Sequence, residues 1–177
     1  AASDVYKRQH KVPGIEMSTG SLGQGFAVCV GMAMANKLDK DPGRIYTLLG
    51  DGELQEGLIW EAAMASAHYK LDNLCAIVDW NGLQIDGSND DVMTVSPIDE
   101  KFKSFGFNVI VIDGHDFGQI FDAFDKAREC KGKPTVIIAK THKGRGVSFM
   151  EDQAGWHGKA PDDAQAKQAV EELGGEV

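Results

Sequence analysis

The sequence predicts an α/β fold built on a parallel sheet. Two apolar runs, residues 45–49 and 74–78, enclose a helical pattern whose apolar positions fall close to one face at a 3.6-residue period. A strand, a helix and a strand in this order form a βαβ unit, which nearly always pairs its two strands in parallel within one sheet. Two further apolar runs, 108–112 and 135–139, predict a third strand, which we expect to be buried, and a fourth.

The bulk properties of the chain limit the classes of protein to which it can belong. Its 177 residues amount to about one domain, and 42% hydrophobic with 25% charged residues is typical of a globular protein. The formal charge of −9 argues against nucleic acid and acidic membranes as partners. The longest uncharged apolar stretch, residues 26–35, suits a buried helix and not a membrane span. Three widely separated cysteines without a CxxC motif favour reduced thiols, so we expect a cytoplasmic protein.

The amino-terminal part of the chain predicts a leader, a glycine-rich turn and a helix. Residues 1–9 show no clear pattern, and we expect them to be an unmatched leader ahead of a single domain over residues 10–177. Gly20 to Gly25 follow the spacing GxxGxG, which is not the dinucleotide fingerprint GxGxxG. The next helix, to about Leu38, is apolar nearly all round, so its own core or another subunit must cover every side of it.

Three more helices are predicted around the third and fourth strands. Residues 99–104 suggest a short helix, and a longer one is expected from about Phe117 to Cys130. The basic, glycine-rich stretch 140–150 lacks the interleaved aromatic residues of a nucleic-acid-binding loop. Residues 162–173 predict a final, mostly polar helix.

Residues whose side chains offer oxygen atoms as metal ligands follow the first two predicted strands. Asp51 comes directly after the first strand and Asn81 soon after the second, at the edge where open α/β sheets bind ligands. Together with a nearby backbone carbonyl, such as that of Leu83, they offer three hard oxygen ligands to Mg²⁺, which takes the others from water and phosphates. Gly52 has no Cβ, so a diphosphate can approach its backbone N–H closely. The sequence therefore predicts a metal site at Asp51, Asn81 and Leu83 that holds an anionic diphosphate.

The same stretch carries a resemblance to a known family. The pattern GDG, followed about thirty residues later by an Asn, resembles the diphosphate-and-metal motif of thiamine-diphosphate enzymes, and GDGELQEGLIWEA (residues 50–62) narrows it to the transketolase family. The resemblance runs from His10 to about Leu173. It implies a thiamine-diphosphate-binding α/β fold with a parallel sheet flanked by helices on both faces. It also implies thiamine diphosphate, Mg²⁺ (or Ca²⁺), and transfer of a two-carbon ketol unit from a ketose phosphate to an aldose phosphate.

The resemblance assigns cofactor-binding roles to two segments. Gly20, Ser21 and Leu22 match the segment that lies against the cofactor rings, with Gly20 allowing close approach and Leu22 providing an apolar platform. In the diphosphate motif, the matching cofactor-binding positions are Gly52, Glu53 and Asn81.

Two further residues match catalytic positions of the family. His157, in Trp-His-Gly, matches a histidine that contacts the cofactor diphosphate and the substrate. Glu56 matches a carboxylate in a network that links two cofactor sites across a dimer, so self-association is expected; the alternative is an acidic residue favoured by the dipole of a helix start.

The chain also departs from the family pattern. Members of the family carry a Gly-His-Pro motif shortly before the segment that matches His10 to Gly25. Counted back from Pro13, the histidine of this motif would fall at Lys7, and His10 is too close to Pro13 to be that histidine. The earlier amino-terminal segment with further histidines and the whole pyrimidine-binding domain are missing from the sequence. We therefore expect the amino-terminal component of a split transketolase, or a fragment of one, which needs a carboxy-terminal partner subunit with the pyrimidine-binding domain. The alternatives are an enzyme like 1-deoxyxylulose-5-phosphate synthase and an inactive assembly or regulatory subunit.

Overall fold

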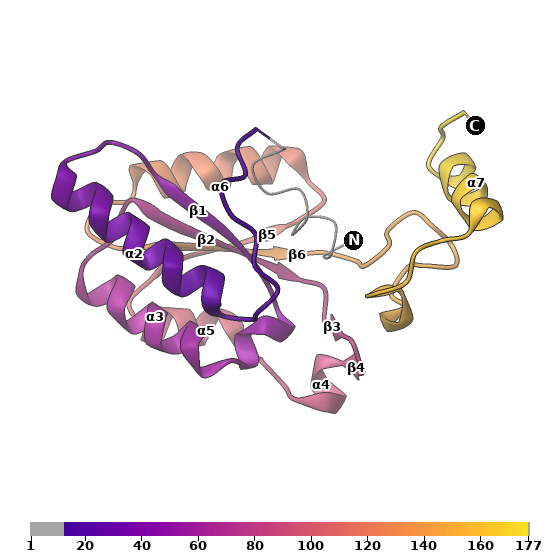
Figure 1. Ribbon diagram of the computed structural model, residues 1–177, viewed down its shortest axis with the longest axis horizontal. Coiled ribbons are helices and arrows are strands. Elements are labelled where there is room, and N and C mark those ends of the chain that lie inside the picture. The colour runs from indigo at the N-terminus through magenta and orange to yellow at the C-terminus, as the bar shows by residue number, and fades with distance from the viewer. Residues whose placement is uncertain (1–12, 177) are drawn as a thin grey trace. The chain divides into compact units, whose positions relative to one another are not determined.

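The computed structural model describes residues 13–176, which form two compact units (Figure 1). The sheet unit comprises residues 21–80 and 95–141, and the described residues of the loop unit are 13–20, 81–94 and 142–176. The predicted leader, with Lys7, and His10 lie outside the described residues. One domain over residues 10–177 stays a prediction.

A four-stranded parallel sheet forms the centre of the sheet unit. The strands are β1 (Ile45–Gly50), β2 (Leu74–Trp80), β5 (Asn108–Asp113) and β6 (Thr135–Lys140), in the spatial order β1-β2-β6-β5. Each neighbouring pair is parallel, with Gly50 opposite Asp79 and Trp80 opposite Lys140 at the carboxyl ends. The predicted parallel βαβ unit is therefore confirmed.

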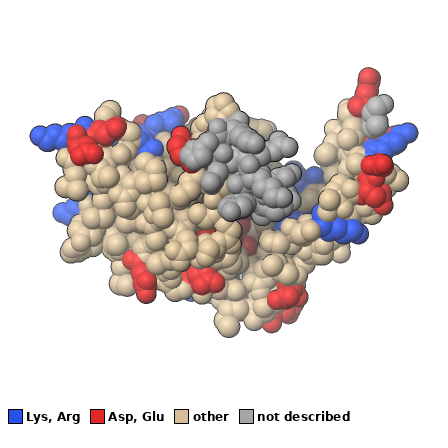
Figure 2. Space-filling view, in the orientation of Figure 1, with Lys and Arg blue, Asp and Glu red and all other residues tan. Residues whose placement is uncertain are grey.

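Helices cover both faces of this sheet. On one face lie α2 (Gln24–Asp39), α3 (Gly57–His68) and α5 (Ile98–Ser104), and on the other lies α6 (Phe117–Glu129) (Figure 1). A 3-10 helix, η1 (Gly52–Gln55), joins β1 to α3. On the side shown in Figure 2, mostly uncharged surface covers the middle of α2. The predicted arrangement, a parallel sheet flanked by helices on both faces, is confirmed.

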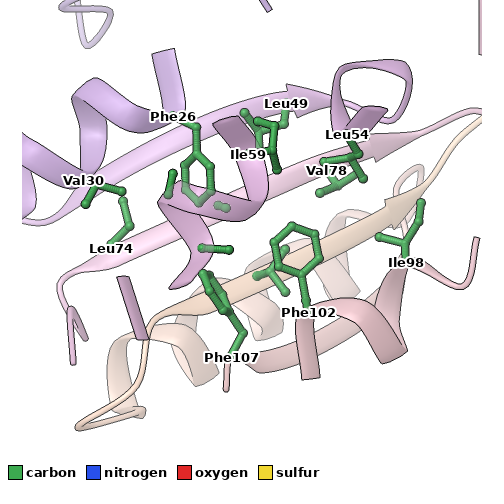
Figure 3. Packing of buried hydrophobic residues seen from close by; sticks show 14 of the residues in the cluster. Phe26, Val30, Leu49, Leu54, Ile59, Leu74, Val78, Ile98, Phe102 and Phe107 are labelled. Atoms are coloured by element: carbon green, nitrogen blue, oxygen red, sulfur yellow. The ribbon is translucent and has the colours of Figure 1, made fainter. Parts of the chain in front are cut away.

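The two faces of the sheet bury alternate residues of the same strands, as the pleat requires. On β2, Leu74 and Val78 pack with Phe26, Ile59 and other helix residues in the larger core (Figure 3). Cys75, the neighbour of Leu74, joins the smaller core under α6. The central strands are thus apolar on both faces, which explains why they read as continuous apolar runs.

The loop unit contains short elements and one longer helix. These are β3 (Leu83–Gln84), β4 (Gly87–Ser88), α4 (Asn89–Val92), the 3-10 helix η2 (Ala154–Trp156) and α7 (Asp163–Glu172). Strands β3 and β4 pair antiparallel. Helix α7 begins with a capping box, in which Asp162 and Gln165 satisfy each other's backbone N–H groups.

Two sequence predictions about burial are wrong or incomplete for the described residues. The sequence predicts a buried β5, but this strand lies at an edge of the sheet and Val111 is 46% exposed. Helix α2 buries Phe26, Val30 and Ala33 but exposes Val28 and Met32, so its own core covers only part of it. Among residues 13–176, no helix has both the length and the apolar character that crossing a membrane requires.

Candidate functional site

Asp51 lies at the carboxyl end of β1, where the strand passes into η1. Its backbone N–H donates to the carbonyl of Asp79 (3.1 Å), which continues the ladder between β1 and β2 by one residue. Its carboxylate accepts from the N–H of Gly52 (2.8 Å), and only 1% of the residue is exposed. Because a buried carboxylate needs hydrogen-bond donors or a cation, this position suits a metal ligand.

The carboxyl ends of β2 and β6 are tied to each other in the same unit. The Thr141 hydroxyl donates to the carboxylate of Asp79, and the Thr141 N–H donates to the carbonyl of Trp80 (3.1 Å). These bonds hold the last residues of β2 in place directly before Asn81. Sequence reasoning missed Asp79 and Thr141, because a side-chain bond between residues so far apart in the chain leaves no local pattern.

Asn81 and Leu83 form a side-chain turn directly after β2, in the loop unit. The Leu83 N–H donates to the side-chain oxygen of Asn81 (3.0 Å), and the Asn89 N–H donates to the carbonyl of Gly82 (2.8 Å). An amide oxygen is a hard oxygen ligand of the kind that Mg²⁺ and Ca²⁺ prefer.

The start of α2 lies next to the turn after β1, which contains Glu53. Ser21 and Leu22, at this start, belong to the predicted ring-contact segment (Gly20, Ser21 and Leu22). Ser21 and Leu22 precede α2, both exposed, and Leu22 is 51% exposed. The Gly23 N–H donates to one carboxylate oxygen of Glu53 (2.7 Å), and the Gly50 N–H donates to the other (3.3 Å). Sequence reasoning missed this contact, since thirty residues separate Gly23 from Glu53.

Glu56 lies at the start of α3. It occupies the N-cap position with an extended backbone, its side chain makes no capping hydrogen bond, and the residue is exposed. This position next to the first turn of α3 is compatible with both interpretations, a carboxylate favoured by the helix dipole and a member of a carboxylate network.

His157 lies in the loop unit, directly after η2. Its backbone N–H donates to the carbonyl of Ala154 (2.9 Å), and the residue is exposed. The preceding residue, Trp156, is anchored by its indole N–H, which donates to the carbonyl of Phe149 (2.8 Å), and by Lys159, whose ammonium lies 4.5 Å from the ring centre. These contacts fix the backbone at His157.

The predicted site residues are therefore divided between the two units. The sheet unit holds two residues of the predicted ring-contact segment, Ser21 and Leu22, together with the acidic turn, namely Asp51, Gly52, Glu53 and Glu56. The loop unit holds the remaining site residues, namely Gly20, Asn81, Leu83 and His157.

By their chemistry, the predicted ligands suit a hard cation with a diphosphate. Among residues 13–176 no three His, Cys, Asp or Glu side chains form a group that could hold a metal. The ligands expected here are of a different kind: one carboxylate, one amide oxygen and one backbone carbonyl, a set that leaves coordination positions for phosphate oxygens and water. Zn²⁺ sites, by contrast, are typically built around His nitrogen or Cys sulfur ligands.

Comparison with known proteins identifies the chain over almost its whole length. A family model described as "Transketolase, thiamine diphosphate binding domain" matches residues 6–177. The chain is 45% identical over 160 residues to the 6-deoxy-6-sulfo-D-fructose transketolase subunit SqwG of Clostridium sp. (strain MSTE9), covering 90% of this chain and 58% of that protein. It is also 45% identical over 165 residues to a subunit of the apulose-4-phosphate transketolase of Actinobacillus succinogenes, covering 93% of this chain and 59% of that protein.

Comparison with solved structures leads to the same family as comparison with the sequences of relatives. The transketolase of Campylobacter jejuni matches with a TM-score of 0.87 and 35% identity, over 95% of this chain and 27% of that one. The chain spans 58% and 59% of the length of the two curated relatives named above. The strand-end acid, the fold and these matches together show that the chain belongs to the transketolase family and contains that family's thiamine diphosphate-binding domain.

Proposed function

We propose that this chain is the thiamine diphosphate-binding subunit, or part of that subunit, of a transketolase. It moves a two-carbon ketol unit from a ketose phosphate to an aldose phosphate. The observation that carries the proposal is Asp51, a carboxylate that is 1% exposed at the carboxyl end of β1 and is followed by the backbone N–H of Gly52. The relatives named as transketolase subunits support the same activity.

In this proposal a divalent ion joins the protein to the diphosphate. Asp51, Asn81 and the carbonyl of Leu83 would hold Mg²⁺ (or Ca²⁺), while the backbone of Gly52 and the side chain of His157 would lie against the diphosphate. Glu53 belongs to the same turn, where its carboxylate accepts from the Gly23 and Gly50 N–H groups. Since the chain carries a net charge of −9, an anionic cofactor needs a metal and backbone N–H groups rather than a basic surface. Gly20, Ser21 and Leu22 face the cofactor rings.

Thiamine diphosphate, when bound, supplies the electron sink that stabilises a carbanion. This chain's residues would orient the cofactor and, through the metal ion that they hold, offset its charge, and the imidazole of His157 would contact the diphosphate and the substrate. Glu56 would take part in a carboxylate network that links two cofactor sites in a self-associated form of the enzyme, for which its exposed position at the start of α3 is suited.

The proposal includes a partner subunit that carries the pyrimidine-binding domain. Two relatives with about 45% identity are named as subunits, and the chain covers 58% and 59% of them. Those names specify a 6-deoxy-6-sulfo-D-fructose and an apulose 4-phosphate as the sugars of the relatives. For this chain we propose sugar phosphates as the substrate class, and a cytoplasmic location.

The test is a reconstituted assay. The chain, co-expressed with the neighbouring reading frame, is assayed with Mg²⁺, thiamine diphosphate and either xylulose 5-phosphate or pyruvate as the donor. We expect turnover with the ketose phosphate and a loss of at least about a hundredfold in Asp51→Asn, because a neutral amide is a poorer Mg²⁺ ligand. The matched control is Asp122→Asn, an exposed residue of α6.

Three results would contradict the proposal in different ways. Pyruvate as the preferred donor would indicate a synthase of the 1-deoxyxylulose-5-phosphate type. Stable assembly with the partner but no turnover would indicate an assembly subunit. Undiminished activity of Asp51→Asn would exclude the metal-binding role of Asp51.

A further inference from the structure

The carboxylate of Glu53 connects two backbone segments that meet at the candidate site. One oxygen accepts from the Gly23 N–H at 2.7 Å, the other from the Gly50 N–H at 3.3 Å. The first N–H belongs to the Leu22–Gly23 peptide and the second to the Leu49–Gly50 peptide. A single half-buried side chain thus bridges the start of α2 and the end of β1.

This contact is made at the N-cap of α2. Gly23 is the N-cap of α2 in a left-handed conformation (φ 81°), and no side chain of the neighbouring sequence caps the helix. The carboxylate of Glu53 therefore provides both an acceptor and a negative charge at the positive end of the helix dipole. A short bond from an N–H to an ionised carboxylate is also stronger than one to a neutral acceptor.

The packing around Gly23 restricts the same position from the opposite side. A Cβ built on Gly23 would lie 3.3 Å from the Cβ of Leu58 and 3.4 Å from the Cβ of Glu56, at the start of α3. The backbone of Gly23 is thus held between α3 and the Glu53 carboxylate.

We propose that Glu53 is a positioning residue that sets the spacing between Leu22 and Asp51. Leu22 lies one peptide before Gly23 and Asp51 one peptide after Gly50, so the two N–H groups bound by Glu53 flank the ring-contact segment and the metal-binding residue. Glu53 acts on the cofactor through this backbone and not by contact with the diphosphate. The inference rests on the proposed function, because it assigns Leu22 and Asp51 the cofactor roles proposed above.

The experiment compares Glu53→Gln and Glu53→Ala with Glu129→Gln, an exposed residue at the end of α6. Gln keeps the shape of Glu but has a single acceptor oxygen, and its NH₂ group faces a second N–H donor. Amide hydrogen exchange at Gly23 and Gly50 is measured by NMR in the protein without cofactor. We expect at least about tenfold faster exchange at one of the two in Glu53→Gln, at both in Glu53→Ala, and no change in the control.

Unchanged exchange at Gly23 and Gly50 would overturn the proposal. If Glu53→Ala does not fold, Glu53→Gln decides alone, because it preserves the side-chain volume. This readout is taken without cofactor, so it remains informative even if the proposed function is wrong.

The second readout is the split between KM and kcat for thiamine diphosphate in the reconstituted enzyme at saturating Mg²⁺. A positioning role predicts an increase in KM of about tenfold, with kcat for bound cofactor reduced by less than about threefold. If the Glu53 variants show faster amide exchange but an unchanged KM for thiamine diphosphate, Glu53 stabilises the fold without positioning the cofactor. That result would overturn the proposal. Failure of the proposed function itself would be recognised by absent turnover in the unsubstituted enzyme and in Glu129→Gln.

Discussion

Cys75 illustrates how burial alone changes the chemistry of a residue. It is 0% exposed in the smaller core between β2 and α6, and burial raises the pKa of its thiol from 9.0 to about 12, against a smaller opposing effect of Arg44. The folded protein therefore keeps this thiol protonated at a pH where the unfolded chain loses the proton. Its contribution to stability is complete below pH 9 and decreases as the pH rises toward 12.

We predict that Cys75→Ala removes part of the alkaline destabilisation. The free energy of unfolding, measured by urea denaturation between about pH 8 and 11, should fall less steeply with pH in Cys75→Ala than in the unsubstituted protein. The absolute stability of the variant is about 1 kcal/mol lower, because a buried sulfur is lost. Cys130, which is partly exposed, serves as the control through Cys130→Ala. Parallel pH profiles of all three proteins would contradict the prediction.

The positions of single site residues were predictable to different degrees. Asp51 and Asn81 could be placed after two strands, because glycine and polar residues interrupt apolar runs at those points. Their joint binding of a metal stays a prediction. The bond from Gly23 to Glu53 could not be predicted, since it depends on how α2 and η1 meet in three dimensions.

At the scale of elements, two glycines at α2 allow a matched comparison. Gly23 has φ 81° and little free space, whereas Gly31 lies within the helix and a Cβ added there would meet nothing within 4 Å. Gly23→Ala is expected to lower the free energy of unfolding by about 1–2 kcal/mol, because an L side chain is strained in the left-handed region. Gly31→Ala should raise it by about 0.5–1 kcal/mol. Urea denaturation measures both, and equal effects of the two substitutions would contradict the assigned backbone conformation.

Helix α7 is attached to the loop that precedes it through one carboxylate. Glu172 accepts from the Ser148 N–H (2.6 Å) and from the Ser148 hydroxyl (2.7 Å), and Gln168 adds a third donor (2.7 Å). These bonds hold the pKa of Glu172 below its ordinary value of 4.5, and the bond from the Ser148 hydroxyl has the largest effect. The attachment is therefore complete above pH 4.5 and is lost as the pH falls through the lowered value.

We predict that Glu172→Ala loosens α7. The protection of the amides from exchange, relative to the unfolded chain at the same pH, should decrease over residues 163–172 and at Ser148 in the variant at neutral pH, and in the unsubstituted protein when the pH is lowered below 4.5. The neighbouring residue provides the control: Glu171 pairs with Lys167 on the same helix (3.9 Å), so Glu171→Ala should leave the exchange at Ser148 unchanged. Equal acceleration in both variants would mean that Glu172 has no special role.

The boundaries of the helices and strands could be predicted from local sequence patterns, but which strands lie next to one another in the sheet could not. The predicted helix from Phe117 to Cys130 ends one residue earlier, and the predicted strand over residues 135–139 extends to Lys140. The order β1-β2-β6-β5, by contrast, depends on long-range pairing. For that reason the sequence could not show that β5 lies at an edge and is only partly buried.

At the scale of the whole molecule, surface that remains uncovered points to further assembly. The apolar character of α2 predicts that its own core or another subunit covers every side. In the described residues, Val28 and Met32 remain 44% and 37% exposed, one helical turn apart. On α3, which packs against α2, Met64 is 56% exposed. Exposed apolar residues on two neighbouring helices are typical of an interface.

We predict that the chain self-associates through this part of α2. Sedimentation equilibrium of the unsubstituted chain should give twice the mass of the single chain at micromolar concentration, whereas Met32→Glu should shift the equilibrium toward the monomer by at least about tenfold, since a charge is costly in a desolvated interface. The matched control is Leu38→Glu: Leu38 is 80% exposed near the end of the same helix and, six residues from Met32, faces another direction. If both variants sediment like the unsubstituted chain, the exposed face of α2 does not form the contact between copies. If Leu38→Glu dissociates the chain as strongly as Met32→Glu, the effect arises from added charge on α2 rather than from its apolar face.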